Sequence, residues 1–520
     1  MTGPTAPTPV DADPSAVSDR LATCTVAVPP ELLDRLATTG ATVSTGDADR
    51  EAAGRDWWPV AIGWAARGQV PARPAAVVRP ATTEQVSAVV AACAAAGVPV
   101  TAMAGRSGVC GGSVPVFGGV ALDCTGLVGD VEVDERSLVA DVPAGTFGPD
   151  LEAALRGTGD GYTLGHWPQS MDLSTVGGWL ACRGAGQYST RYGKIEDMVI
   201  GLEVVLADGR VVHTEGRGPR AATGPSLTQL FVGSEGTLGI VTRASFRVHP
   251  LPPATGRRAF GFAGPTGFAD GLDACRRVLR RGATPAVLRL YDPVESGRNF
   301  DRPDTSVLVV LDEADPGLLA ATLEVVDQEC ARTAGRPGSP GADRLPDDLV
   351  DRWLSHRNDV SALAPLWRAD VVVDTVEVAG RWAVLPSLAD DVVAALGALT
   401  GTLVASVHQS HAYPDGACLY FTFAGRQPDS AGDPHEPGDM VWEERYYRDA
   451  WDVVTATVQR HGAAISHHHG IGLNRSRFLP DALGSGFDVL AAVKHALDPA
   501  GILNPGKLGL PSPFGEVPWP

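Results

Sequence analysis

Three glycine-rich segments constrain the fold of this chain more than any other feature. They span residues 104–113 (AGRSGVCGGS), 165–183 and 233–241 (GSEGTLGIV). Glycine allows tight turns and close approach of the backbone to a ligand, and successive backbone N–H groups in such a turn can bind a phosphate. The first segment matches neither GxxxxGK[ST] nor a GxGxxG that opens a helix. Taken alone, it could equally be a simple turn.

Local patterns place these segments among alternating strands and helices. Val77–Val78 predicts a strand, Thr82 with Gln85 is a capping box that opens a helix, and Gly97 ends that helix. Asp208-Gly209 between two apolar runs predicts a hairpin. Further strands are expected at 98–101, 119–123, 137–141, 200–206, 210–214, 246–248, 259–262, 286–291, 306–311, 371–378, 402–408 and 417–424, and helices at 30–66, 266–281, 317–333 and 440–461.

Length and charge limit the domain count and the partners. A chain of 520 residues predicts two or three domains. The net charge of −19 disfavours nucleic acid and anionic membranes as main partners. Because no apolar stretch reaches membrane-spanning length, we expect at most peripheral membrane contact.

Cysteine usage and the N-terminal segment predict a cytoplasmic protein, and the Ala- and Arg-rich composition suits a bacterial one. The eight cysteines show no CxxC spacing, which indicates reduced thiols. Residues 1–20 are rich in Pro, Thr, Ala and Asp and predict disorder rather than a signal peptide.

Three consecutive histidines, His467, His468 and His469, concentrate imidazole at one point of the chain. Imidazole titrates near neutral pH, so the run predicts proton transfer or metal binding. A solvated loop and an affinity tag are the alternatives, but tags lie at termini. Ile465 and Ile471 on either side indicate a partly buried loop.

Together, the three glycine-rich segments resemble the vanillyl-alcohol oxidase (PCMH-type) family of flavoenzymes. The marks of that family are a glycine-rich pyrophosphate loop, an S-T-V-G-G segment (Ser174–Gly178 here) and an E-G-T-L-G segment (Glu235–Gly239 here), in this order. The resemblance implies an α+β fold: a two-subdomain PCMH-type FAD-binding domain, followed by an α+β cap (substrate) domain with an antiparallel sheet.

The resemblance also implies non-covalently bound FAD and the residues that contact it. These are Ala102, Met103, Ala104, Gly105, Arg106, Ser107, Gly108, Gln169, Ser170, Met171, Asp172, Leu173, Ser174, Thr175, Cys182, Arg183, Gly184, Ala185, Glu235, Gly236, Thr237, Leu238, Gly239, Ile240 and Val241. Cys110 lies where related flavoenzymes place a flavin-linking histidine, but a buried free thiol is the favoured interpretation.

Within this family, further segments are similar to the alkyldihydroxyacetonephosphate synthases. They are Ser170–Trp179, Gly218–Pro225, Arg289–Asp292, Asp415–Phe421 and Ser466–Gly472. This similarity implies exchange of the acyl group of acyl-dihydroxyacetonephosphate for a fatty alcohol, through a flavin N5 adduct and without net redox change. The product is an ether lipid precursor, and the substrate is a phosphorylated, lipid-like small molecule.

The same similarity implies roles for individual side chains. Tyr420 matches the catalytic tyrosine, with the three histidines as hydrogen-bonding or cationic neighbours, since a free tyrosine has a pKa near 10. Arg289 matches an arginine important for activity, and its fixed charge suits a phosphate. A second substrate arginine is either Arg357 or Arg368. Because adjacent residues cannot all point the same way, we expect at most two of the three histidines to meet Tyr420 or substrate.

The alternative function is an FAD-dependent oxidase or dehydrogenase of a 2-hydroxy acid or alcohol. Relatives with that chemistry use a metal site with a Gly-Glu-His-Gly segment, whereas this chain has His-His-His-Gly. We therefore predict no metal, although His408 and His411 could supply imidazoles to a zinc ion. A non-catalytic flavin- or metal-binding protein is a third, less favoured interpretation.

The predicted organisation has five parts, in a chain that could form a homodimer. They are a disordered 1–20, an N-terminal helical region at 21–71, the FAD-binding domain at 72–252, the cap domain at 253–500, and a segment at 501–520 that returns to the FAD-binding domain.

Overall fold

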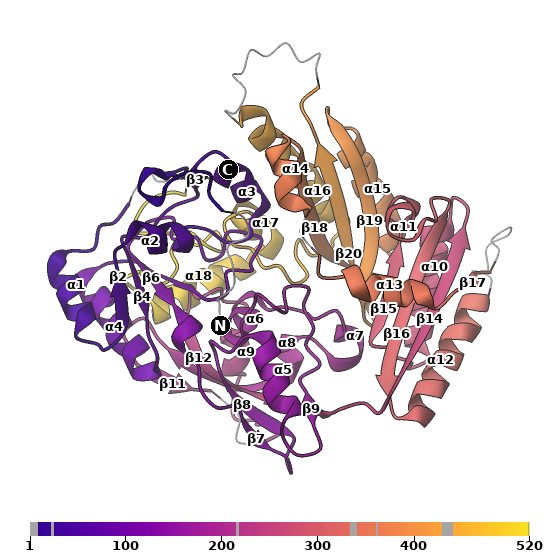
Figure 1. Cartoon of the computed structure of the whole chain (residues 1–520), viewed down its shortest axis with the longest axis horizontal. Helices are drawn as coiled ribbons and strands as arrows, with labels where there is room; N and C mark the ends of the chain where they lie inside the picture. Colours follow the sequence, from indigo (N-terminus) through magenta and orange to yellow (C-terminus); the bar gives the residue numbers. More distant parts are fainter. Residues whose placement is uncertain are drawn as a thin grey trace.

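A computed structural model shows an α+β chain in which two small sheets form one half and a seven-stranded antiparallel sheet forms the other (Figure 1). It describes residues 9–21, 25–214, 218–332, 341–359, 362–428, 440–517 and 519. Within those ranges, no helix is long and apolar enough to cross a membrane.

The first sheet has four strands in the order β2-β4-β6-β5. Its strands are β2 (Thr42–Ser44), β4 (Ala76–Arg79), β6 (Val120–Asp123) and β5 (Val100–Met103), and the helices around it are α1 (Pro30–Ala37), α2 (Asp47–Ala53) and α4 (Thr83–Ala96). The helix α3 (Pro59–Ala65) instead packs into the core of the seven-stranded sheet. Thr82 caps α4 by accepting from the Gln85 N–H, and Gly97 ends it at φ 63°. Both helix signals in the sequence are therefore confirmed.

The second sheet is a five-stranded antiparallel sheet in the order β11-β10-β12-β8-β7. Its strands are β11 (Val211–His213), β10 (Val199–Val205), β12 (Ile240–Arg247), β8 (Val139–Pro143) and β7 (Glu132–Asp134), with β9 (Tyr162–Thr163) paired to β13 (His249–Pro250) beside it. The helices are α5 (Gly148–Arg156), α6 (Val176–Cys182), α7 (Ser189–Tyr192), α8 (Ile195–Met198) and α9 (Leu227–Phe231). The Asp208-Gly209 hairpin joins β10 to β11, as predicted.

The third sheet runs β17-β14-β16-β15-β19-β20-β18, and every neighbouring pair is antiparallel. Its strands are β17 (Asp343–Leu345), β14 (Ala254–Ala263), β16 (Thr305–Ala314), β15 (Val287–Tyr291), β19 (Thr402–Ala412), β20 (Gly416–Gly425) and β18 (Val372–Arg381). The helices of this half are α10 (Gly267–Arg280), α11 (Pro293–Phe300), α12 (Pro316–Ala331), α13 (Asp348–His356), α14 (Leu363–Arg368), α15 (Leu385–Gly397) and α16 (Val441–Arg460).

Alternation along these strands decides which side chains face the other half of the molecule. In β15, Leu288 and Leu290 pack into the core beneath α10, α12, α15 and α16. In β20, Leu419 and Phe421 enter that same core. Since successive side chains of a strand point to opposite faces, Arg289 and Tyr420 share the other face. The sheet thus brings together two residues separated by more than a hundred positions.

The N-terminal residues differ from the sequence prediction. Residues 1–8 lie outside the described residues, but Pro14–Ala16 form a 3-10 helix and β1 (Ser18–Asp19) pairs in parallel with β3 (Gln69–Val70). Val10 and Val17 are buried with Ala65 and Val70. Expected disorder for 9–20 was therefore wrong, because two apolar side chains and a strand pairing hold this segment. The region 21–71 is also not purely helical, since β2 joins the first sheet.

The chain returns to the first half earlier than residue 501. The helices α17 (Leu479–Leu483) and α18 (Gly486–Leu497), drawn in yellow in Figure 1, lie beside the two smaller sheets. The buried Lys494 of α18 donates to Thr237 O and Leu503 O at 2.8 Å each and pairs with Asp498. This clamp ties α18 to the third glycine-rich segment, through Thr237, and to Leu503.

Lys494→Met should destabilise the protein by about 3–5 kcal/mol, because it leaves the Asp498 carboxylate and two carbonyl groups buried without their cation. His495→Ala, at an exposed position of the same helix, is the matched control and should change stability little. Urea unfolding of both variants measures the difference. Equal stability of the two variants would show that the clamp is dispensable.

Candidate functional site

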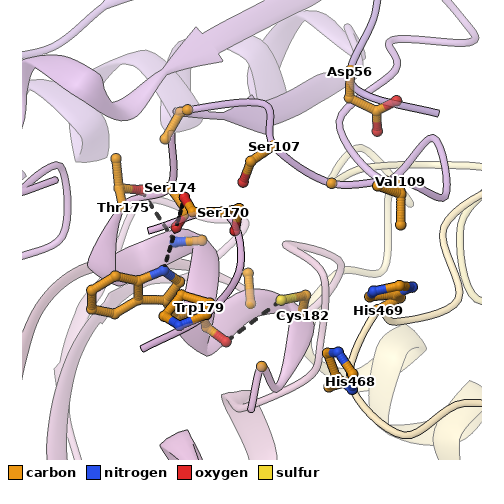
Figure 2. A pocket seen from close by; sticks show the side chains of 18 of the residues that line it. Asp56, Ser107, Val109, Ser170, Ser174, Thr175, Trp179, Cys182, His468 and His469 are labelled. Carbon is orange, nitrogen blue, oxygen red and sulfur yellow. Dashed lines mark hydrogen bonds between the residues drawn. The ribbon is translucent and has the colours of Figure 1, made fainter. Parts of the chain in front are cut away.

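A deep cavity lies where the two halves meet, and residues from all three glycine-rich segments line it. Figure 2 shows Ser107, Ser170, Ser174 and Thr175 on one side and His468 and His469 on the other. The cavity thus joins the glycine-rich segments to the histidine loop and the seven-stranded sheet.

Twenty of the expected cofactor contacts line this cavity. They are Ala102, Met103, Ala104, Gly105, Arg106, Ser107, Gly108, Gln169, Ser170, Leu173, Ser174, Thr175, Cys182, Gly184, Ala185, Glu235, Gly236, Gly239, Ile240 and Val241. The other five do not. Met171, Thr237 and Leu238 are buried in the protein core, while Asp172 and Arg183 are exposed.

Glycine is required where two of the segments touch. A Cβ at Gly105 would lie 2.0 Å from Leu173 O, so the first and second segments meet backbone to backbone. Thr175 caps α6 by accepting from the Gly178 N–H, and a Cβ at Gly177 would lie 3.0 Å from that of Ala144. The result is a narrow cradle lined by backbone.

Several lining side chains were not expected from the sequence. His166 is fully buried against Trp179, with its ring centroid 4.6 Å away, and neither of its ring nitrogens has a hydrogen-bond partner. Gln187 Oε1 and Asp56 Oδ2 are also buried without a partner. Burial raises the pKa of Asp56 to about 7 and lowers that of His166 to about 3. His166 belongs to the second glycine-rich segment, but Asp56 and Gln187 lie outside all three segments and carry no motif that a sequence could reveal.

These features fit FAD. Orphaned polar atoms inside a cavity cost free energy unless a ligand pairs with them, and a cofactor with a polar ring edge and many oxygens can do so. The backbone-lined cradle suits the pyrophosphate, as expected for such loops. Cys110 is a buried free thiol in the cavity wall, and burial raises its pKa well above its usual value.

Tyr420 reaches the cavity wall from β20 of the seven-stranded sheet. It pairs across the strands with Glu377 of β18 and His408 of β19, and its ring stacks on that of His408 with centroids 4.9 Å apart. Its Oη is 2.8 Å from His468 Nε2 and 2.9 Å from His469 Nε2. Two of the three histidines therefore meet Tyr420, as expected.

The imidazoles act on Tyr420 as hydrogen-bond partners, not as cations. Burial lowers the pKa of His467 and His468 to about 3 and that of His469 to about 4. The rings are therefore neutral at pH 7. Burial, with the neighbouring Cys418 and Glu377, also raises the pKa of Tyr420 well above its usual value. Of the two kinds of neighbour expected for Tyr420, the run thus supplies the hydrogen-bonding one and not the cationic one.

Two carboxylates, the buried Glu377 and the half-buried Glu235, hold the histidine loop in place. Glu377 accepts from Ser466 Oγ at 3.0 Å and from the N–H groups of His467 and His469, and it pairs with Arg475 at 2.8 Å. Burial alone would raise the pKa of Glu377, but Arg475 and the imidazoles hold it well below its usual value.

Glu235 acts on the other end of the same loop. Its carboxylate accepts from the N–H groups of Ile471 at 2.6 Å and Gly472 at 2.8 Å. The sequence indicated a cofactor contact for this residue. The structure shows that its carboxylate also connects the third glycine-rich segment to the histidine loop.

Arg289 enters the cavity from β15. Its Nη2 is 2.6 Å from His408 Nε2, and His408 Nδ1 is 2.8 Å from Glu295 Oε2. Burial lowers the pKa of His408, so its neutral ring accepts from Arg289 and donates to Glu295. Arg289 Nε stays buried without a partner.

Of the two candidates for a second arginine, one lies beside this site. The guanidinium of Arg357 is 5.7 Å from the Trp353 ring, and that of Arg289 is 5.9 Å from the same ring. Arg357 Nη1 is buried without a partner, and the adjacent Asn358 lines the cavity. In contrast, Arg368 pairs with Asp11 at 3.2 Å, and its side chain is 42% exposed.

Three imidazoles are close enough to share a metal ion. One ring nitrogen each of His411, His467 and His468 lie within 4.8 Å of one another. However, both ring nitrogens of His467 and of His468 are already within hydrogen-bond distance of a neighbour. His467 does not line the cavity, unlike the other two members of the run.

Comparisons with known proteins agree with this geometry. Residues 74–215 match the family described as FAD binding domain, and residues 256–508 match FAD linked oxidases, C-terminal domain. The chain is 30% identical over 449 residues to an uncharacterised FAD-linked oxidoreductase, YgcU, of Escherichia coli (strain K12), covering 84% of this chain and 89% of that protein.

Other relatives carry two different names. Alkyldihydroxyacetonephosphate synthase of Dictyostelium discoideum is 28% identical over 479 residues, 85% of this chain and 74% of that protein. The glycolate oxidase subunit GlcD of Bacillus subtilis (strain 168) is 28% identical over 453 residues, 85% of this chain and 90% of that protein. A solved structure of alkyldihydroxyacetonephosphate synthase has a TM-score of 0.73 at 23% identity and covers 96% of this chain and 89% of that one.

Gly105→Ala should weaken FAD binding about tenfold or more, a loss of about 1.4 kcal/mol or more, because the added Cβ forces Leu173 away. Gly397→Ala, with no atom within 4 Å of the added Cβ, is the control. Flavin released from the purified variants and FAD titration of the apoproteins measure the effect. Unchanged affinity in Gly105→Ala would contradict the assignment of the cradle.

Proposed function

The chain belongs to the family of FAD-linked oxidases, and we propose that within this family it acts as an alkyldihydroxyacetonephosphate synthase-like transferase. In this proposal, the acyl group of acyl-dihydroxyacetonephosphate is exchanged for a fatty alcohol without net redox change. The observation that carries it is Tyr420, whose hydroxyl lies between two neutral imidazoles at the cavity wall.

Tyr420 is equipped to move a proton without becoming a permanent anion. Its pKa lies well above its usual value, so a tyrosinate is costly unless its proton passes directly to a neighbour. His468 and His469 each place Nε2 within 3 Å of its oxygen. A proton taken from or returned to the substrate carbon next to the carbonyl can therefore pass through the phenol. Bound FAD supplies the electrophilic ring system of the reaction.

The two arginines support a phosphorylated substrate. Arg289 Nε and Arg357 Nη1 are buried donors without partners, and both guanidinium groups flank Trp353. A dianionic phosphate would pair with both. His408 and Glu295 hold Arg289 from behind, which limits its rotation and fixes the direction in which its free N–H points.

Oxidation of a 2-hydroxy acid is the second candidate, because the glycolate oxidase subunit is equally similar and paired arginines also bind carboxylates. The three close imidazoles could then hold a metal ion. Against it, His467–Gly470 reads His-His-His-Gly and lacks the glutamate of the Gly-Glu-His-Gly segment that metal-dependent relatives use.

The deciding experiment incubates the purified holoenzyme with acyl-dihydroxyacetonephosphate and a labelled fatty alcohol. We expect labelled alkyl-dihydroxyacetonephosphate and one equivalent of fatty acid. Tyr420→Phe should lower the rate about 10²–10⁴-fold while FAD content is retained. Tyr162→Phe, which removes a phenol bonded to Glu135 away from the cavity, should leave the rate unchanged.

A different set of results would contradict the transferase proposal. Anaerobic bleaching of the flavin by a 2-hydroxy acid, with formation of the keto acid and a stoichiometric metal ion in the protein, would replace the transferase with the oxidoreductase.

Arg357→Met should lower kcat/KM for the phosphorylated substrate about 10–100-fold, as expected for loss of a charge-assisted hydrogen bond of about 1.5–3 kcal/mol. Arg368→Met removes the same charge at the exposed pair with Asp11 and should have no effect. Steady-state kinetics with both variants compares them directly. An effect of Arg368→Met that equals or exceeds that of Arg357→Met would reverse the assignment.

A further inference from the structure

Tyr413 lies outside the cavity but is connected to it through the histidine loop. It follows β19 at the turn that leads into β20, and it is partly exposed. Its Oη is 3.0 Å from His467 Nε2, and its ring stacks on that of His467 with centroids 5.6 Å apart. His467 Nδ1 is in turn 2.8 Å from His468 Nδ1, and His468 Nε2 reaches Tyr420.

We propose that Tyr413, His467 and His468 form a proton relay between Tyr420 and solvent, with Tyr413 as its outer end. The relay consists of three hydrogen bonds in series, each of 2.8–3.0 Å. Tyr413 acts through the histidines and does not touch substrate. Its use in catalysis rests on the proposed transferase function, because that reaction removes a proton and later returns one.

The donors and acceptors can be assigned in two complete ways. A neutral imidazole has one N–H and one bare nitrogen. In the outward arrangement, Tyr420 O–H donates to His468 Nε2, His468 Nδ1–H donates to His467 Nδ1, and His467 Nε2–H donates to Tyr413 Oη. In the inward arrangement, every one of these bonds is reversed. All links are satisfied in both cases without a charged ring.

One transfer converts one arrangement into the other. A proton leaves the substrate for Tyr420 Oη, the phenol proton moves to His468 Nε2, and the proton on His468 Nδ1 moves to His467 Nδ1. The proton on His467 Nε2 then moves to Tyr413 Oη, and the proton of that phenol passes to water. The balance is one proton from substrate to solvent, with no electron moved and no charge left in the relay.

The surroundings give this route an end outside the cavity. Tyr420, His468 and His469 line the cavity that FAD and substrate would fill, whereas His467 and Tyr413 do not. The partly exposed Tyr413 is bordered by Lys194, whose Nζ is 4.7 Å from the ring centroid and which pairs with Asp197. Ser189 Oγ also lies 3.0 Å from Tyr413 Oη and 2.8 Å from His411 Nδ1, which fixes the position of the phenol.

The test compares two substitutions at Tyr413 in the FAD-loaded enzyme. Tyr413→Phe keeps the ring on His467 but removes the hydroxyl, and kcat should fall about 10–100-fold with KM and FAD content unchanged. The kcat of Tyr413→Ala should fall by a similar factor, but the smaller side chain opens a path to His467. Added imidazole buffer should therefore restore the kcat of this variant, and the restored rate should saturate as the imidazole concentration rises. Imidazole should not restore Tyr413→Phe. Tyr162→Phe is the matched loss of a phenol elsewhere.

Unchanged kcat in Tyr413→Phe, or a Tyr413→Ala variant that imidazole does not restore, would overturn the relay. A second measurement does not depend on turnover. In protein labelled with ¹⁵N-histidine, both tautomers of His467 should be populated in the wild type, and Tyr413→Phe should shift His467 to one of them. A wild-type enzyme without alkyl exchange would refute the proposed function, whereas a His467 tautomer insensitive to Tyr413→Phe would refute the relay.

Discussion

The histidine loop is held by two carboxylates that come from different halves of the molecule, the buried Glu377 and the half-buried Glu235, and the site depends on this arrangement. Glu377 from β18 binds the first part of the loop and Arg475, while Glu235 from the third glycine-rich segment binds the second part. Loss of one partner of the buried Glu377–Arg475 ion pair costs about 3–5 kcal/mol, and Glu235 adds two hydrogen bonds to the loop backbone. The loop therefore has one position relative to both the sheet and the cofactor cradle.

Glu377 also fixes the position of Tyr420 relative to the histidine loop. Glu377 lies directly opposite Tyr420 in the β18–β20 pair, so the group that anchors the histidines is a fixed neighbour of the phenol they contact. A shift of one residue in this pairing would turn Tyr420 into the apolar core. The residues Leu419 and Phe421, which fill that core, therefore protect the alignment of the site.

Much of the fold could be predicted from the sequence, because its signals are local. Helix caps such as Thr82 and Gly97, the Asp208-Gly209 hairpin and the ordered glycine-rich segments each depend on a few neighbouring residues. The order of residues 9–20 could not be predicted, since it depends on a strand pairing with residues 69–70. The early return of the chain likewise depends on Lys494, whose partners lie in other segments.

In the site, too, local motifs could be predicted and long-range contacts could not. The glycine-rich cradle, Tyr420 and the histidine run are recognisable as motifs in the sequence, but the separate contacts of the three histidines are not. Adjacent residues differ in their contacts here, because His468 and His469 face Tyr420, whereas His467 faces Tyr413. Long-range contacts also distinguish Arg357 from Arg368, since only the pairing with Asp11 shows that Arg368 is engaged at the surface.

Burial of the imidazoles explains why a run of three histidines suits proton transfer in this setting. In water, an imidazole with a pKa near neutrality would hold a proton part of the time, and a trapped charge would interrupt a chain of hydrogen bonds. Here burial lowers the pKa of all three rings to about 3–4, so each stays neutral and offers one donor and one acceptor. The deep burial that makes Tyr420 a poor acid by itself thus also keeps its neighbours able to pass its proton onward.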